Sequence, residues 1–152
     1  EDGLRINKLK LKKSLSEVFN PGRFQTVSRD PLLIIDISHN IHSVKTLIEN
    51  FKLEYNKKKI NIIIGMLKDK NPLECIKLLK KIAKNIYLTE VPNERSFKAK
   101  NIAKKLENKN IHYIENNQIP TILGKNEDYL ITGSIYLLGS ILKKKYVKID
   151  IN

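Results

Sequence analysis

The chain has 152 residues, of which 41% are hydrophobic and 30% are charged. These values are typical of one globular domain and argue against a disordered segment. No apolar run approaches the roughly 20 residues that a membrane-spanning helix requires, and the polar N-terminus is not typical of a secretory signal. The formal net charge of +13 attracts polyanions, so nucleic acid is the first partner class to consider.

The 29 lysine and arginine residues are spread along the chain rather than gathered in one segment. They fall mostly at predicted helix ends and on helix backs, with few aromatic residues among them to stack on bases. A solvated lysine face is therefore favoured over a nucleic-acid groove, and nucleic acid is not the expected partner.

Cys75 is the single cysteine of the sequence, so no internal disulfide can form and a reducing, cytoplasmic compartment is expected. No partner in the sequence marks Cys75 as a nucleophile, and we interpret it as a thiol on a helix face.

The first half of the chain begins with residues 1–20, whose apolar residues could form a helical stripe that ends before Pro21. A lead-in or linker from a preceding domain is equally consistent with this segment. The β-rich runs 24–28 and 32–36 flank a turn-favouring Ser-Arg-Asp-Pro sequence and predict an antiparallel hairpin. Apolar residues that recur from 41 to 51 predict a helix, and the continuous apolar run 60–64 predicts a strand buried on both faces.

The middle of the chain continues this alternation of strands and helices. A second helix is predicted to begin at Pro72, with Ile82 and Ala83 on its inward face. A strand at 85–88 follows, and then a helix with an apolar stripe from 99 to 106.

The last third of the chain contains predicted strands at 111–114 and 128–132. The segment 115–127 between them is short and polar, and Pro120 and Gly124 interrupt it, so no helix is assigned to it. Residues 134–142 are nearly all apolar and predict a final helix packed inside the molecule or between layers. The whole pattern predicts an α/β domain with a mainly parallel sheet.

Ligands of open α/β sheets bind beyond the carboxyl ends of the parallel strands. Those ends fall here at 36–40, 65–70, 89–90 and 132–134, and three of the four carry several polar groups directly before a predicted helix.

The first strand end carries Asp36, which can accept hydrogen bonds from ribose hydroxyls, and His39, which with the helix N-terminus can hold an adenine edge or a phosphate. Equally, Ser38 or Asn40 is an N-cap and His39 only packs. His39 and His42 have metal-ligand spacing, but no third ligand is evident and a metal site is not expected.

The other two strand ends also allow two interpretations each. Asp69 and Lys70 follow Gly65 in a loop, where Asp69 serves equally well as a helix cap. Ser134 follows a glycine that permits close backbone approach, and its hydroxyl can hold a carboxylate at the helix start or simply cap that helix.

Several catalytic signatures are absent from the sequence. It contains no GxxxxGK[ST] phosphate loop, no GxGxxG fingerprint, no Ser/His/Asp grouping in the context of a nucleophile, and no Cys/His metal cluster. A self-sufficient ATPase or dehydrogenase is therefore not expected.

Taken in order, four segments resemble one family, the folylpolyglutamate and dihydrofolate synthases. The resemblance covers about residues 15–142. The family motifs PGR-x-Q, D-G-A-H-N, DKD and TGS-x-Y correspond to residues 21–25, 36–40, 69–71 and 132–136. Two departures are Ile37-Ser38 in place of Gly-Ala, and Asn71 in place of the second acid of DKD.

The resemblance implies a Mur ligase-type C-terminal domain over residues 21–152, with residues 1–20 leading from a missing N-terminal ATPase domain. The implied fold is a Rossmann-like three-layer sandwich, a mainly parallel sheet with one antiparallel edge strand. The implied enzyme is an ATP-dependent ligase that adds L-glutamate to folate or dihydropteroate through an acyl phosphate. ATP and Mg²⁺ would be held mainly by the N-terminal domain, so this chain alone would be inactive and would contain no catalytic residue.

The resemblance also assigns binding roles to residues of this chain. Arg23 would contact the ATP phosphates, Asp36 the ribose, and His39 with Asn40 the nucleotide. The glutamate subsite would involve Ser134, Asp69 and Lys70. The alternatives are a Mur-type peptidoglycan ligase, against which the PGR-x-Q and TGS-x-Y motifs argue, and a basic α/β nucleic-acid-binding module.

Overall fold

The computed structural model describes residues 22–56 and 58–147, so the predicted lead-in at 1–20 lies outside the described residues. The strands are β1 (Gln25–Arg29), β2 (Leu32–Ile35), β3 (Ile60–Ile64), β4 (Ala83–Leu88), β5 (Ile111–Tyr113) and β6 (Tyr129–Thr132). The helices are α2 (Ile41–Tyr55), α3 (Pro72–Leu79), α4 (Ala99–Leu106), α5 (Ile119–Leu123) and α6 (Ile135–Lys143), with short 3-10 turns at Lys68–Lys70 and Asn116–Gln118.

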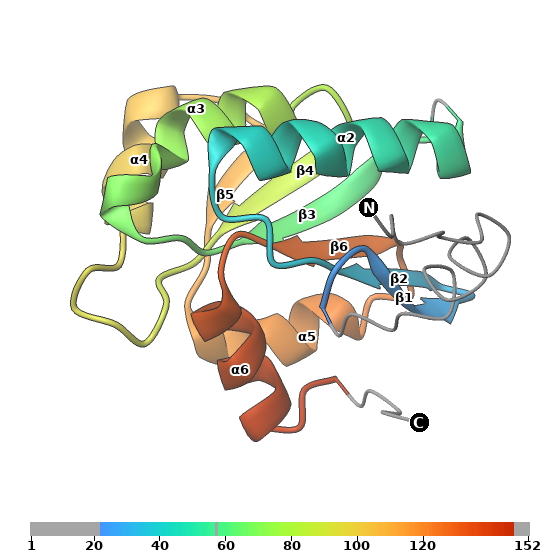
Figure 1. The fold of residues 1–152 in the computed structure, drawn as a ribbon. Helices are drawn as coiled ribbons and strands as arrows, with labels where there is room; N and C mark the ends of the chain where they lie inside the picture. The colour runs from blue at the N-terminus through green and yellow to red at the C-terminus, as the bar shows by residue number, and fades with distance from the viewer. Residues whose placement is uncertain (1–21, 57, 148–152) are drawn as a thin grey trace, which may run out of the picture.

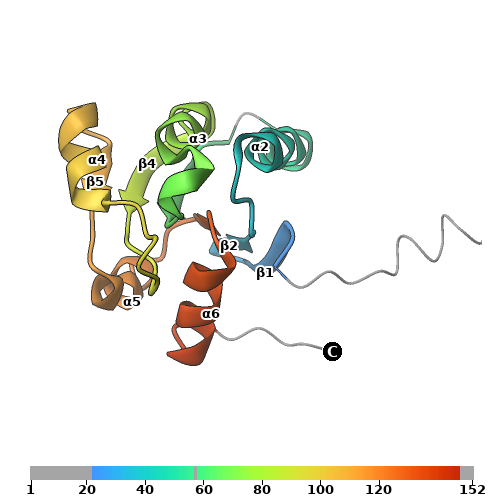
Figure 2. The ribbon, with the colours of Figure 1, turned by 60° about the vertical axis from the view of Figure 1, so that its left-hand side comes forward.

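The six strands form one sheet in the order β1-β2-β6-β3-β4-β5. The edge strand β1 pairs with β2 in antiparallel fashion, and the other neighbours are parallel. Helices α2, α3 and α4 cover one face of this sheet, while α5 and α6 lie on the other (Figures 1 and 2). The predicted three-layer sandwich with one antiparallel edge strand is confirmed.

The position of β6 between β2 and β3 creates a switch point in the sheet. The chain leaves β3 toward α3 on one face, but leaves β6 toward α6 on the opposite face (Figure 1). The two connections therefore diverge and leave a crevice at the carboxyl ends of β3 and β6, which is where ligands bind in open α/β sheets.

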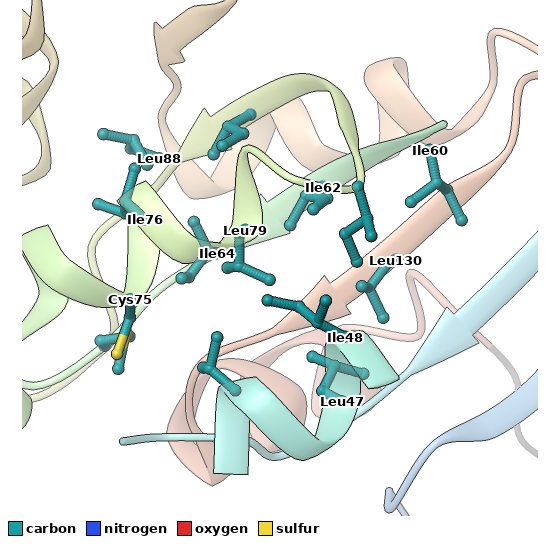
Figure 3. Packing of buried hydrophobic residues seen from close by; sticks show 14 of the residues in the cluster. Leu47, Ile48, Ile60, Ile62, Ile64, Cys75, Ile76, Leu79, Leu88 and Leu130 are labelled. Carbon is teal, nitrogen blue, oxygen red and sulfur yellow. The ribbon is translucent and has the colours of Figure 1, made fainter. Parts of the chain in front are cut away.

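The central strand β3 is buried along its whole length, as its continuous apolar run predicted. Ile62 and Ile64 pack in the cluster beneath α2 and α3, and Ile63 belongs to the cluster on the opposite face. Figure 3 shows Leu47 and Ile48 of α2 in the first of these clusters with Ile76 and Leu79 of α3.

The structure corrects the C-terminal end of the predicted second helix, which is shorter than the apolar spacing indicates. Helix α3 ends at Leu79, Ile82 lies in the following turn, and Ala83 begins β4. Ile82 is nevertheless 2% exposed, and its carbonyl accepts a hydrogen bond from the Ile60 N–H at 3.0 Å. A buried turn residue thus continued the apolar spacing of the helix, so periodicity alone could not locate the helix end.

The segment 115–127 contains the short helix α5, which the sequence interpretation did not assign. Pro120 lies in its first turn and Gly124 at its C-cap. A proline in the first turn removes an N–H that has no partner within the helix. Pro120 and Gly124, which were interpreted as interruptions, therefore mark the two ends of α5.

Candidate functional site

A tight turn before β1 presents the side chain of Arg23 to solvent. Gly22 has φ +77° in this turn, a backbone conformation that favours glycine, and its Cα packs against Leu138 and Ile37. The Gly22 N–H donates to Gln25 Oε1 at 3.0 Å. The glycine and glutamine of the PGR-x-Q motif therefore shape the turn that carries the arginine.

The carboxylate of Asp36 lies at the end of β2 and is 8% exposed. Its Oδ2 accepts the Phe24 N–H at 2.9 Å, and its Oδ1 accepts the Ser38 N–H at 2.7 Å. The Thr132 hydroxyl at the end of β6 donates to the same Oδ1 at 3.4 Å. Asp36 thus joins the arginine turn, the loop that leads to α2, and the neighbouring strand.

Asn40 is the N-cap of α2, as one of the two sequence interpretations proposed. Its Oδ1 accepts the Ser43 N–H at 2.9 Å, and the Asn40 N–H donates back to Ser43 Oγ at 3.2 Å. His39 is exposed, and its Nδ1 lies 3.0 Å from the carbonyl oxygen of Ile37. Because a carbonyl oxygen only accepts, a hydrogen bond here requires the proton on Nδ1.

A pocket of about 230 Å³ occupies the switch-point crevice, and we call it the apolar pocket. The residues that line it include Ile37, His39, Leu67, Lys70, Ser134 and Tyr136. Gly133 also lines this pocket, with φ +110°. A Cβ at this position would come within 2.6 Å of the carbonyl oxygen of Gly65, which directly follows β3. Ser134 is buried and caps α6 by accepting the Tyr136 N–H at 3.1 Å.

Asp69 lies beside the apolar pocket in an exposed ion cluster. Its Oδ2 is 2.7 Å from an Arg95 guanidinium nitrogen and 3.7 Å from Lys70 Nζ. Desolvation acts to raise the pKa of Asp69, but hydrogen bonds from the backbone and from Arg95, with the charges of Arg95 and Lys70, hold that pKa below its usual value. Asp69 does not cap α3, because the N-cap of that helix is Asn71.

A second hollow, the α2 groove, has a volume of about 360 Å³ and lies between the arginine turn and α2. The residues that line it include Arg23, Phe24, Asp36, His42 and Asn50.

Five of the seven predicted site residues line these two hollows, and Asn40 and Asp69 line neither. His39, Lys70 and Ser134 meet in the apolar pocket, whereas Arg23 and Asp36 meet in the α2 groove. Residues 22–56 and 58–147 contain no group of three His, Cys, Asp or Glu side chains that could hold a metal ion.

Sequence reasoning did not single out three residues at the site. Ile135 and Tyr136 border the apolar pocket and are 64% and 44% exposed, and Arg95 holds Asp69. Tyr136 belongs to the TGS-x-Y motif, so that signal was present. Ile135 lies in an apolar run, where the sequence does not distinguish an exposed apolar residue from a core residue. Arg95 lies 26 residues from Asp69, and no local pattern connects the two.

Comparison with known proteins agrees with this fold. The family model described as "Mur ligase, glutamate ligase domain" matches residues 22–126, and the chain belongs to this family. The match covers the arginine turn, the α2 groove and the β3 side of the apolar pocket.

The curated relatives carry one name, dihydrofolate synthase/folylpolyglutamate synthase. The protein from Buchnera aphidicola of Schizaphis graminum is 30% identical over 94% of this chain and 35% of its own length. The protein from Bacillus subtilis is 31% identical over 88% of this chain and 32% of its own length. The chain thus spans about a third of the length of these relatives.

Solved structures show the same fold. Bifunctional folylpolyglutamate synthase/dihydrofolate synthase from Yersinia pestis, complexed with AMPPNP and Mn ion, matches with a TM-score of 0.80 at 21% identity, over 95% of this chain and 36% of that one. Folylpolyglutamate synthase from Thermotoga maritima matches with a TM-score of 0.73 at 26% identity, over 92% of this chain and 34% of that one. No helix in the described part of this chain is long and apolar enough to cross a membrane.

Proposed function

We propose that this chain is the C-terminal domain of a cytoplasmic folylpolyglutamate synthase/dihydrofolate synthase, which uses ATP to add L-glutamate to folate or dihydropteroate through an acyl phosphate. The observation that supports this proposal most is the apolar pocket at the switch point, where His39, Lys70 and Ser134 meet. Ile37, which also lines this pocket, lies next to Gly22 of the turn that carries Arg23. Membership of the glutamate ligase domain family supports the same reaction.

In the proposed ligase, the active site is shared between this chain and an N-terminal ATPase domain of the same polypeptide. The chain spans about a third of its relatives, and the sequence contains no phosphate loop. The described residues supply cationic and hydroxyl groups but no cluster of acids, and Asp69 is held by Arg95 and Lys70. This donor set fits nucleotide phosphates and a carboxylate, so the Mg²⁺ ligands belong to the ATPase domain.

Arg23 acts on the phosphates of ATP in this proposal. A guanidinium remains charged at all physiological pH values and presents fixed donors to phosphate oxygens. It neutralises charge that develops as the terminal phosphoryl group moves to the substrate carboxylate. Asp36 lines the same groove as Arg23 and binds the ribose in this proposal. His39 borders the apolar pocket and Asn40 caps α2, so both approach the nucleotide from outside that groove.

The apolar pocket receives the incoming glutamate in this proposal. Lys70 and the N-terminus of α6 at Ser134 attract a carboxylate, while Asp69 orients Lys70 through their ion pair. The glutamate amino group then attacks the acyl phosphate, with release of phosphate. The apolar walls formed by Leu67 and Tyr136 keep water from that intermediate once the two domains close.

The upstream coding sequence provides the first test. A GKGS-type phosphate loop on the order of hundreds of residues before Glu1, as expected from typical domain lengths, supports the division of the site. A start codon immediately before Glu1 would contradict it.

Nucleotide binding by the isolated chain provides a second test. Because half of the site is missing, we expect binding of ATP to be weaker than micromolar by calorimetry. Micromolar or tighter affinity would contradict the shared site.

Substitution of Arg23 tests the chemistry in the full-length ligase. We expect Arg23→Ala to lower kcat/KM for ATP about a hundredfold, because a preorganised charge at the phosphoryl group is lost. Arg29→Ala is the matched control, since Arg29 is exposed at the far end of β1. Equal activity of the two variants would refute the role of Arg23.

A further inference from the structure

The loop between β4 and α4, residues 89–98, is bonded through its backbone to the loop that follows β3. The Lys68 N–H donates to the Arg95 carbonyl oxygen at 2.8 Å, and the Phe97 N–H donates to the Met66 carbonyl oxygen at 3.0 Å. Two such bonds on either side of one residue pair fix the separation of the two segments. The backbone of Arg95 is therefore held beside the 3-10 turn that follows β3.

Further contacts fix the conformation of the 89–98 loop. Leu67, which lines the apolar pocket, forms an isolated antiparallel bridge with Ser96. Ser96 is buried, and its hydroxyl oxygen accepts the Val91 N–H at 2.9 Å. The Arg95 N–H donates to Asn93 Oδ1 at 2.8 Å. The backbone from which the Arg95 side chain extends is thus defined from both sides.

Asp69 lies between two cations, and its contacts with them are unequal. Its Oδ2 accepts a hydrogen bond from Arg95 Nη2 at 2.7 Å, whereas Lys70 Nζ stands 3.7 Å from the same oxygen. The shorter contact is a charge-assisted hydrogen bond, and the longer one is an ion pair beyond hydrogen-bond distance. Because both cations approach one oxygen, Arg95 takes the closer position and Lys70 is kept farther away.

This difference matters for the apolar pocket because Lys70 lines it. An ammonium that donates to a neighbouring carboxylate would have to give up that bond to bind an anionic ligand. With Arg95 bonded to Asp69, the Lys70 ammonium retains its donors for an anion in the pocket. Arg95 does not belong to the described lining of the pocket, so its effect on a ligand there passes through Asp69.

We propose that Arg95 is a positioning residue for the incoming glutamate, because by holding Asp69 it keeps Lys70 available to the glutamate carboxylate. This inference rests on the proposed function for the identity of the ligand of Lys70. The pairing of Arg95 with Asp69 depends only on the structure.

Titration of the Asp69 carboxyl carbon by NMR in this chain tests the pairing without any substrate. Desolvation acts to raise the pKa of Asp69 and a backbone hydrogen bond acts to lower it; Arg95 then lowers it through a hydrogen bond and its charge, and Lys70 through charge alone. We expect Arg95→Ala to raise this pKa more than Lys70→Ala does. An equal or larger rise in Lys70→Ala would make Lys70 the main partner of Asp69 and would overturn the proposal.

A double-mutant cycle in the full-length ligase tests the effect on glutamate. We expect Arg95→Ala to raise KM for glutamate about tenfold, as the loss of a hydrogen bond to a charged group implies, while kcat changes less than about twofold. In an Asp69→Asn background, the same substitution should raise this KM less than about twofold, because the carboxylate that would capture Lys70 is gone. A similar rise in both backgrounds would show that Arg95 contacts glutamate itself and would overturn the proposal.

Lys98→Ala is the matched control within the same loop. Lys98 is also an exposed cation, and its acidic partner is Glu90, with 3.9 Å between Lys98 Nζ and Glu90 Oε2. We expect this variant to leave KM for glutamate unchanged. A rise equal to that of Arg95→Ala would mean a general disturbance of the loop and would also overturn the proposal.

Lys70→Ala separates failure of this inference from failure of the proposed function. If Lys70→Ala raises KM for glutamate and Arg95→Ala does not, the inference fails and the proposed function stands. If neither variant changes KM, the proposed glutamate subsite fails, and the positioning role of Arg95 fails with it. A rise in both variants, with the Arg95 effect lost in the Asp69→Asn background, is the result that we expect.

Discussion

Gly133 illustrates how a single residue meets two demands at the site. Its φ of +110° is unfavourable for any residue with a Cβ, and the Gly65 carbonyl oxygen occupies the space where a Cβ would lie. Gly139, only six residues later, has open space around it on α6. The same residue type is therefore required at the end of β6 and dispensable in the helix that follows.

This contrast predicts opposite effects of two identical substitutions. We expect Gly133→Ala to lower the free energy of unfolding by about 1–3 kcal/mol, because the clash is with backbone and the conformation is strained. Gly139→Ala should raise it by about 0.5–1 kcal/mol, because alanine favours a helix interior. Urea denaturation of both variants measures the difference, and equal effects would contradict the assignment.

Cys75 gives a second prediction at the residue scale. Burial, and then the charge of Glu74, raise the pKa of its thiol to about 11, although a backbone hydrogen bond acts in the opposite direction. The thiolate is then roughly 10⁻⁴ of the total at neutral pH. We expect a thiol reagent to modify Cys75 only after unfolding in guanidinium; rapid reaction of the native chain would contradict the buried, inert thiol.

Helix α2 is positioned at its first residue by the capping box and along its length by burial. Asn40 and Ser43 satisfy each other's backbone N–H groups, and Val44, Leu47 and Phe51 face the sheet. The cap fixes where the helix begins, and hence where the loop with His39 ends.

This arrangement predicts that Asn40 contributes to stability as well as to the proposed nucleotide site. Asn40→Ala should lower the free energy of unfolding by about 1 kcal/mol, whereas Asn40→Ser should preserve it, because a serine hydroxyl is an equally good cap. Thermal denaturation followed by circular dichroism measures both. The capping role would be refuted if Asn40→Ala left the free energy of unfolding unchanged or if Asn40→Ser lowered it.

At the scale of the whole molecule, two acidic residues connect neighbouring strands at the end of the sheet where the parallel strands begin. Glu127 accepts hydrogen bonds from Lys84 and Asn61, and Asp128 accepts the Leu32 N–H and pairs with Lys58. The hydrogen bond from Lys84 outweighs desolvation and lowers the pKa of Glu127 from its usual 4.5. For Asp128, desolvation acts to raise the pKa, but Lys58 and the Leu32 N–H together hold it below 3.8.

These lowered pKa values predict acid sensitivity with a definite sign. The unfolded chain binds protons at higher pH than the folded one, so the stabilisation is complete above about pH 4.5 and is lost as pH falls through the folded pKa values. We expect the urea midpoint to fall over this range, and to fall less steeply for Glu127→Gln. Glu94→Gln, an exposed acid, is the control, and an identical pH profile for all three proteins would contradict the prediction.

Much of this architecture was predictable because it is encoded locally. A continuous apolar run identified β3 and helical apolar spacing identified α2, and the ends of the predicted strands pointed to Asp36, His39 and Ser134. The errors came where local patterns are ambiguous. Ile82 continued a helical stripe although it lies in a turn, and Pro120 was interpreted as a break although it lies in the first turn of a helix.

The sequence by itself determined the order and type of most elements, the α/β class and the absence of a phosphate loop, since periodicity, turn residues and motifs are local properties. Only the tertiary structure decided that β6 lies between β2 and β3. That non-local pairing brings His39, Lys70 and Ser134 into one pocket and places Arg23 and Asp36 in another hollow. Strand order depends on contacts between residues far apart in the chain, and no local pattern specifies which strand ends become neighbours.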